Sequence, residues 1–267
     1  MSEKHIITIN SAIIYIIAFL LTTIIHESFH AIFGWFFGSN PIIHHNYVKH
    51  LSTEHLTLFQ KSTIALAGPL ISLTQGVLFG TFYFKARPKP QGLGNLFLLW
   101  FSVLGLLNFL GYLMTGFLFK QGDIGKFYLL TETPFWGQIT VAVIAGLLLV
   151  FVAYKMTTPY LKFCYKKKWL INGKARKHFS LHILFLPWIV GSVIVTLLYL
   201  PIIALVSIIY PVMSGMIFIF PWQNADSVEL TSISGVKELG KISYLSTGIL
   251  LFLIIIFKFV LAPGIKF

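Results

Sequence analysis

The chain contains a single cysteine, Cys164, among its 267 residues. One thiol excludes an internal disulfide, and it excludes a zinc or iron–sulfur site built from several cysteines. Charged residues are also scarce: Asp, Glu, Lys and Arg make up 10% of the chain, against about 25% in an average soluble domain. The sequence is therefore not that of a water-soluble globular protein.

Long stretches of the chain carry no charged residue at all. An uncharged apolar stretch of about 18 residues or more is typical of a membrane-spanning helix. We therefore expect an all-α fold, a polytopic transmembrane helix bundle in a lipid bilayer, which in a bacterial cell would be the plasma (inner) membrane. The uncharged stretches are 5–26, 62–84, 90–119, 133–154, 178–225 and 242–257.

Turn residues between these stretches give approximate limits for six spans. The 178–225 stretch would be about 72 Å long as one straight helix, more than two hydrocarbon thicknesses. It therefore forms one kinked span with a partly buried segment, or two spans, which would make seven; its prolines are Pro187, Pro201, Pro211 and Pro221. The other expected helices cover about 6–37, 57–84, 93–119, 134–154 and 244–262.

The chain is strongly basic, with 20 Lys and Arg residues against 8 Asp and Glu residues. A nucleic-acid binder needs such charges on a solvated face, but eight of the 20 lie between Lys155 and Lys177, in one loop between spans. That cluster is typical of an orientation signal or a contact with anionic lipid, and we expect no nucleic-acid partner. The positive-inside rule places the loops at 85–92 and 155–180 in the cytoplasm.

One motif of ionisable residues interrupts the first apolar stretch, His26-Glu27-Ser28-Phe29-His30. Residues four apart share a helix face, so the imidazoles of His26 and His30 can reach one ion. Glu27 lies beside them, where it can act on a metal-bound water as a general base. This is the H-E-x-x-H zinc pattern. The alternative is a set of core histidines bonded to neighbouring helices, but ionisable residues inside a membrane are functional by default.

A catalytic zinc takes three protein ligands and keeps one position open, so we expect one Zn²⁺ per chain. Asp123 is the candidate third ligand, because it follows the third span and the apolar helix can carry it beside the first. Its alternative role is that of an ordinary turn carboxylate. We expect solvated side chains, rather than a second metal site, for the four loop histidines that follow the motif, His44, His45, His50 and His55.

Two features of the second and third spans concern the surroundings of this site. Gly68 and Pro69 introduce a small residue and a kink, which would let a neighbouring helix or a substrate backbone approach closely. Asn108 could orient a substrate carbonyl or stabilise an oxyanion. Plain helix packing is the alternative for the first pair, and a hydrogen bond between helices is the alternative for Asn108.

The order of these elements resembles that of the site-2 protease family of intramembrane zinc metalloproteases. The similarity covers about residues 20–126 and rests on the histidine motif, then Ala67-Gly68-Pro69, then Asn108 and Asp123. The resemblance implies peptide-bond hydrolysis inside the membrane, with zinc held by two His and one Asp. It also implies a zinc near the cytosolic side, whereas the positive-inside rule places the corresponding loops outside; the two orientations exclude each other.

The resemblance implies that residues 1–130 form a three-span zinc metalloprotease core. Residues 131–267 form a C-terminal membrane region with a basic loop at 155–180 and the proline-punctuated segment at 178–225. The expected function is hydrolysis of peptide bonds in or near transmembrane segments of substrate proteins, so the partner is a membrane protein or a transmembrane peptide. The alternatives are a non-catalytic pseudoprotease that keeps the metal site and binds partner transmembrane helices, and an enzyme that acts on a lipid or a lipidated peptide.

Overall fold

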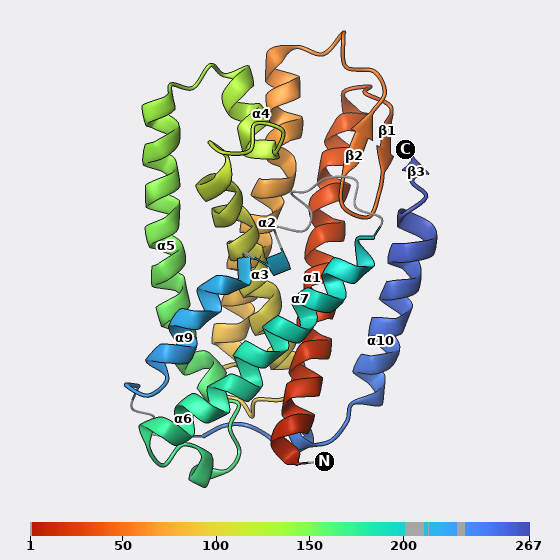
Figure 1. The fold of residues 1–267 in the computed structure, drawn as a ribbon. Helices are drawn as coiled ribbons and strands as arrows, with labels where there is room; N and C mark the ends of the chain where they lie inside the picture. Colours follow the sequence, from red (N-terminus) through yellow and green to blue (C-terminus); the bar gives the residue numbers. More distant parts are fainter. Residues whose placement is uncertain (1, 201–210, 213, 229–232) are drawn as a thin grey trace.

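The structure is a computed structural model that describes residues 2–200, 211–212, 214–228 and 233–267. Within these residues, six helices are long and apolar enough to cross a membrane, which confirms the predicted helical bundle with six spans. The chain is therefore a multi-pass membrane protein. The six helices, shown in Figure 1, are α1 (Glu3–Phe36), α2 (Leu58–Ala86), α3 (Leu93–Thr115), α5 (Phe135–Leu161), the helix Gly173–Leu198 and the helix Tyr244–Leu261.

The last two spans each contain a short π-helical turn. In the fifth span the π-helical turn comes just before Pro187, which has no backbone N–H for a regular helical hydrogen bond. The fifth span consists of α6 (Gly173–Ser180), η2 (Leu181–Phe185) and α7 (Leu186–Leu198), and the sixth consists of α10 (Tyr244–Ile255) and η5 (Ile256–Leu261).

Shorter elements cap the bundle. Three strands form an antiparallel sheet in the order β2-β1-β3, at the end where the first span leads into the second. This sheet was not predicted, because strands of two or three residues are too short to show an alternating pattern. The strands are β1 (Pro41–Ile43), β2 (Val48–His50) and β3 (Ile265–Lys266), and the short helical elements are α4 (Asp123–Leu130), η1 (Lys167–Trp169), η3 (Ser214–Phe218), α9 (Ile219–Asn224) and η4 (Lys237–Gly240).

The helix limits follow local chemistry more closely than they follow hydropathy. The Thr57 side chain and Gln60 form a reciprocal capping box that starts α2. A different helix, α5, shows the effect at its C-terminal end. It continues to Leu161, seven residues beyond the expected limit of the span at 154. Its basic residue Lys155 places its ammonium group 5.4 Å from the ring centre of Phe151, and a lysine can keep its stem on apolar surface in this way.

Among the described residues, the uncharged 178–225 stretch contributes to one helix long enough to span, which begins before the stretch, at Gly173. That helix ends at Leu198, and residues 201–210, including Pro201, lie outside the described part of the chain. Beyond them, η3 and α9 are short segments, and α9 packs against α5.

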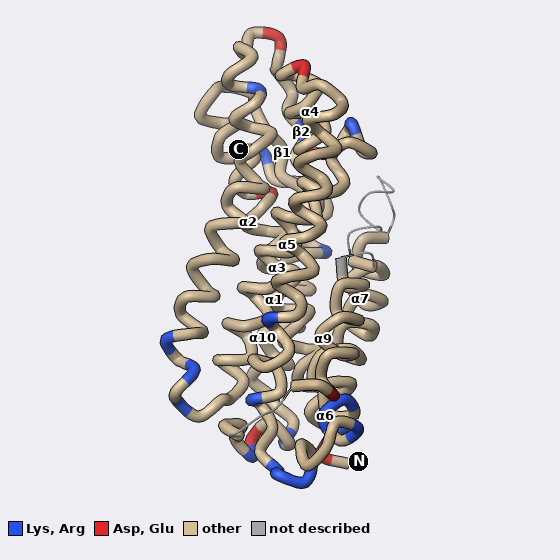
Figure 2. The backbone as a smooth tube through the Cα atoms, turned by 90° about the vertical axis from the view of Figure 1, so that its left-hand side faces the viewer, with Lys and Arg blue, Asp and Glu red and all other residues tan. Residues whose placement is uncertain are grey.

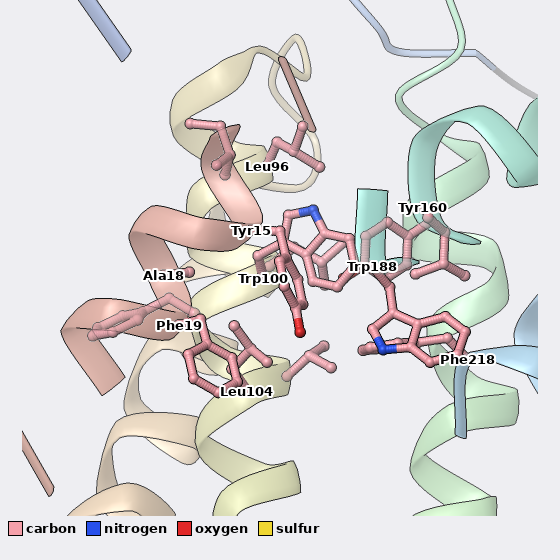
Figure 3. Close-up of a cluster of buried hydrophobic side chains, with 14 of the residues drawn as sticks. Tyr15, Ala18, Phe19, Leu96, Trp100, Leu104, Tyr160, Trp188 and Phe218 are labelled. Carbon is pink, nitrogen blue, oxygen red and sulfur yellow. The ribbon is translucent and has the colours of Figure 1, made fainter. Parts of the chain in front are cut away.

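Close packing of the first three spans fixes the geometry of the bundle. Trp100 of α3 donates a hydrogen bond from Nε1 to Ser11 Oγ of α1 at 3.0 Å. Its ring meets the edge of Tyr15 at a centroid distance of 5.0 Å. In Figure 3 these rings lie in a cluster of buried side chains that also includes Tyr160, Trp188 and Phe218. The cluster therefore joins the N-terminal spans to the C-terminal region.

The two ends of the bundle differ in charge. The loops at 85–92 and 155–180 lie at the same end, because residues 234–235 bond to both of them: Gln91 N–H donates to Ser234 O at 2.7 Å, and Gly235 N–H donates to Cys164 O at 3.1 Å. Figure 2 shows most Lys and Arg residues at this end, with the N-terminus. The sheet and α4 lie at the other end. We call these the basic end and the sheet end.

Candidate metal centre

The histidine motif lies inside the membrane-spanning part of α1. His30 and His26 come six and ten residues before the end of the helix at Phe36, which is about 9 and 15 Å along its axis. Both rings and the carboxylate of Glu27 are buried, with 5%, 1% and 7% of each residue exposed. The site is therefore below the surface of the bundle, on the side of the sheet end.

The three residues named as metal ligands from the sequence converge on one point. His26 Nε2 lies 3.0 Å and His30 Nε2 lies 3.2 Å from Asp123 Oδ2. The two Nε2 atoms are 3.1 Å apart. Among the described residues, these three form the group whose ligand atoms are close enough together to hold one metal ion.

Neighbouring groups fix the tautomer of each imidazole. His30 Nδ1 is 2.6 Å from the backbone oxygen of Ile64, which can only accept, so Nδ1 carries the proton. His26 Nδ1 is 3.1 Å from Ser72 Oγ, whose hydroxyl donates to Gly68 O at 3.0 Å. Ser72 therefore accepts from His26 Nδ1. In both rings Nε2 is left with a lone pair directed at the site.

This arrangement fits a cation. Two imidazole lone pairs and a carboxylate oxygen repel one another at 3.0–3.2 Å unless a proton or a metal ion lies between them. A tetrahedral zinc with bonds of about 2.0–2.1 Å holds its ligand atoms about 3.3 Å apart. The nitrogen and oxygen donors, their spacing and the fixed tautomers all suit zinc with three protein ligands.

Gly68 allows the second helix to approach the histidines. A Cβ atom at this position would lie 2.6 Å from His26 Nε2 and closer still to His30 Nε2. Gly68 and Pro69 are both buried, and neither lines the cavity next to the site. The structure thus supports the packing role for Gly68 rather than contact with a substrate.

Asp123 reaches the histidines from the start of α4. The chain turns tightly after α3, and the backbone of Phe119 and Lys120 packs so close to Gly125 that a side chain there would collide with it. Burial raises the pKa of the Asp123 carboxyl, but His30 and His26 outweigh burial and hold that pKa well below its ordinary value. The carboxylate is therefore ionised, as a ligand must be.

A cavity of about 1550 Å³ adjoins the three candidate ligands and includes Glu27 in its wall. Asn108 also lines it; this side chain is 3% exposed, and its Oδ1 has no hydrogen-bond partner among the described residues. Tyr112 lines it one turn further along α3 and stacks on His26 at a centroid distance of 5.1 Å. The cavity thus brings together a carboxylate, an amide oxygen without a partner in the described ranges and the three candidate metal ligands.

The prediction of solvated loop histidines is wrong for His45. This side chain is 4% exposed and packs between the rings of Tyr199 and Phe257, because the β1–β2 turn inserts it between two helices. His50 is partly buried, lines the cavity and bonds through Nδ1 to Ser39 Oγ at 2.7 Å. Burial, with a smaller effect of His30 and Lys126, lowers the pKa of His50 to about 4.

Sequence reasoning missed the groups that orient the histidines. Ser72 lies one turn after Gly68, so the 3.6-residue period could have placed its hydroxyl on the face of α2 that meets the motif. The Ile64 oxygen belongs to the backbone, so the residue type at position 64 gave no indication of its role. The 3.6-residue period could also have placed Tyr112 on the same face of α3 as Asn108, because it comes four residues later.

No protein-family model, no curated protein and no solved structure matches the chain.

Proposed function

We propose that the protein is an intramembrane zinc metalloprotease that hydrolyses peptide bonds in or near transmembrane segments of other proteins. The proposal rests above all on one observation: two imidazoles with fixed tautomers and one carboxylate direct three lone pairs at a common point inside a span. Glu27, next to the first ligand in sequence, opens onto the adjoining cavity. The resemblance to site-2 proteases, stated above, agrees with this chemistry.

His26, His30 and Asp123 would hold the metal. When bound there, zinc would supply Lewis-acid chemistry: it would polarise a carbonyl and lower the pKa of a water molecule towards neutrality. Glu27 accepts a proton from the attacking water and returns it to the leaving nitrogen as the peptide bond breaks. Asn108 has an amide oxygen, Oδ1, without a hydrogen-bond partner among the described residues, and this oxygen orients the scissile peptide by accepting from its N–H.

The cavity has one polar wall and one apolar wall, and we infer that water reaches the site along the first and a membrane peptide along the second. At the sheet end the lining is polar and includes His50, Lys61 and Lys126. Along the bundle it is apolar, and Met114 and Met216 on this part of the wall also have 39% and 47% of their surface exposed. A hydrophobic segment would thus enter from the bilayer and meet water that comes from the sheet end.

Cleavage by the Glu27→Gln variant tests the proposal. The full-length protein is purified with zinc, reconstituted in lipid and given a fluorogenic peptide whose scissile bond lies within an apolar helix. Glutamine keeps the size of the side chain but cannot accept the proton, so we expect a loss of about 10²–10⁴-fold in cleavage rate with unchanged zinc content.

Glu54→Gln is the matched control, because Glu54 is an exposed carboxylate at the same end of the molecule. It should cleave at the wild-type rate. Equal rates for Glu27→Gln and the wild type would contradict the mechanism. A wild-type protein that holds zinc, binds the peptide and cleaves none of it would favour the pseudoprotease instead.

A further inference from the structure

Two lysines on the cavity wall have no part in the metal chemistry. The charged residues that line the cavity, within the described ranges, are Glu27, Asp123, Lys61 and Lys126. The two carboxylates belong to the candidate metal centre. Neither lysine has a carboxylate within 4 Å in the described part of the chain. The cavity thus presents two ammonium groups without an acidic partner.

The backbone fixes both lysines close to the metal ligands. Lys126 comes three residues after Asp123 on α4, and residues three apart lie on one helix face, one turn apart. Lys61 comes three residues before Ile64 on α2, whose carbonyl oxygen accepts the hydrogen bond from His30. Because α2 and α4 pack against each other, the two lysines flank the sheet end of the cavity.

The distribution of charge over the whole molecule indicates what these lysines would meet. Of the two orientations that exclude each other, we take the one that the positive-inside rule gives, with the basic end of the bundle on the cytoplasmic side, over the opposite one that the resemblance implies. A membrane segment that enters the cavity follows the same rule, so its own Lys- and Arg-rich flank lies at that end. The part of the segment near the sheet end is then poor in positive charge and is free to carry acidic residues.

We propose that Lys61 and Lys126 select transmembrane substrates that carry Asp or Glu beside the segment held at the metal centre, on the side of the sheet end. This inference rests on the proposed function, because it names the substrate class of the same site. Lys61 is partly buried and Lys126 is exposed, so the lysines form ion pairs with the substrate at the water-facing mouth of the cavity, where each pair is weak and the two act together. They thereby also set the register of the bound segment.

Peptide binding tests the inference separately from catalysis. The full-length Glu27→Gln protein is reconstituted in neutral lipid vesicles and titrated with three labelled transmembrane peptides, which differ only in a Glu-Glu, Gln-Gln or Lys-Lys pair in the flank. We expect the Kd to rise about three- to tenfold from Glu-Glu to Gln-Gln and further to Lys-Lys, with a smaller difference at high salt.

The double variant Lys61→Glu/Lys126→Glu, in the same background, should reverse the order of the three peptides. Lys120→Glu is the matched control, since this exposed lysine precedes α4 without lining the cavity, and it should keep the wild-type order. Equal affinity for all three peptides, or binding of none, would overturn the inference. So would a preference that vanishes when phosphatidylglycerol is added, because the lysines would then bind lipid headgroups.

Cleavage of the same peptides by the wild-type protein distinguishes the two proposals. Charge-selective binding without cleavage would contradict the protease and leave the selectivity standing. Cleavage at equal kcat/KM for the three peptides would support the protease and contradict the role of the lysines.

Discussion

At the scale of single residues, the candidate metal centre depends on groups that would not themselves touch the metal. Ser72 and the Ile64 carbonyl each engage one imidazole through Nδ1, at 3.1 and 2.6 Å. Such partners fix the ring orientation and raise the basicity of the ligand nitrogen. A substitution at Ser72 can remove its hydroxyl and leave the candidate ligands unchanged. The Ile64 oxygen belongs to the backbone, so no side-chain substitution removes it.

Ser72→Ala removes the acceptor of His26 Nδ1, so that ring can rotate and can take the other tautomer. We expect zinc affinity to fall about 10–100-fold, measured by competition with a chelator of known affinity. Thr74→Ala is the control, because Thr74 is an exposed hydroxyl on the same helix that bonds to its own helix backbone. A Ser72→Ala protein with wild-type affinity would show that the hydroxyl does not orient the ligand.

Gly68→Ala should disturb the site more than its small size suggests. The added methyl group would overlap the Nε2 atoms of both histidines, and a buried helix interface has little room to relax. We expect the protein to fold but to bind about one tenth or less of the wild-type zinc. Gly94→Ala is the control, since a Cβ there meets nothing within 4 Å. Equal zinc content in the two variants would contradict the close approach of α2.

At the scale of elements, the β1–β2 turn joins the site to the C-terminal spans. Its residue His45 is buried against Tyr199, which directly follows the fifth span, and Phe257 of the sixth, with no hydrogen-bond partner for either ring nitrogen among the described residues. Burial, aided by Lys258 and His44, lowers the pKa of His45 from 6.5 to about 4. An unpaired buried imidazole of this kind destabilises the fold.

The pH dependence of stability follows from that lowered pKa. The unfolded chain binds a proton at His45 more readily than the fold does, so stability is complete above pH 6.5 and falls as the pH falls towards 4. His45→Leu should remove this loss and stabilise the protein by about 1–3 kcal/mol near pH 4. The measurement is the thermal midpoint in detergent between pH 4 and 8.

Ile43→Leu, at a buried position of the same hairpin, has no titratable group and should keep the wild-type slope. A His45→Leu protein that loses stability with falling pH as steeply as the wild type would show that His45 does not titrate in this range.

At the scale of the whole molecule, the hydropathy of the sequence predicted the helical bundle. The H-E-x-x-H motif named two of the three residues that meet in the candidate metal centre, His26 and His30. Long uncharged stretches are a strong signal because a bilayer requires about 20 apolar residues per helix. Connectivity alone placed Asp123 near His30, since the third span returns the chain to the end where the first span leaves. The structure brings these residues together, at 3.2 Å.

Other features had too little signal in the sequence. The sheet consists of strands of two or three residues, too few for a period of two to emerge. The burial of His45 depends on packing against helices more than 150 residues away. In the sequence, Lys61 and Lys126 are indistinguishable from ordinary interfacial lysines. Only the packing of α2 against α4 places both on the wall of one cavity.

The zinc content of the purified full-length protein tests the central claim most directly. Wild type, His26→Ala, Asp123→Ala and the exposed-histidine control His5→Ala are purified in detergent and measured by atomic emission after exchange against equimolar zinc and magnesium. We predict about one zinc per chain in the wild type and in His5→Ala, and about one tenth of that or less in the two ligand variants. A wild type without zinc, or variants of His26 and Asp123 that keep it, would contradict the metal centre and the function built on it.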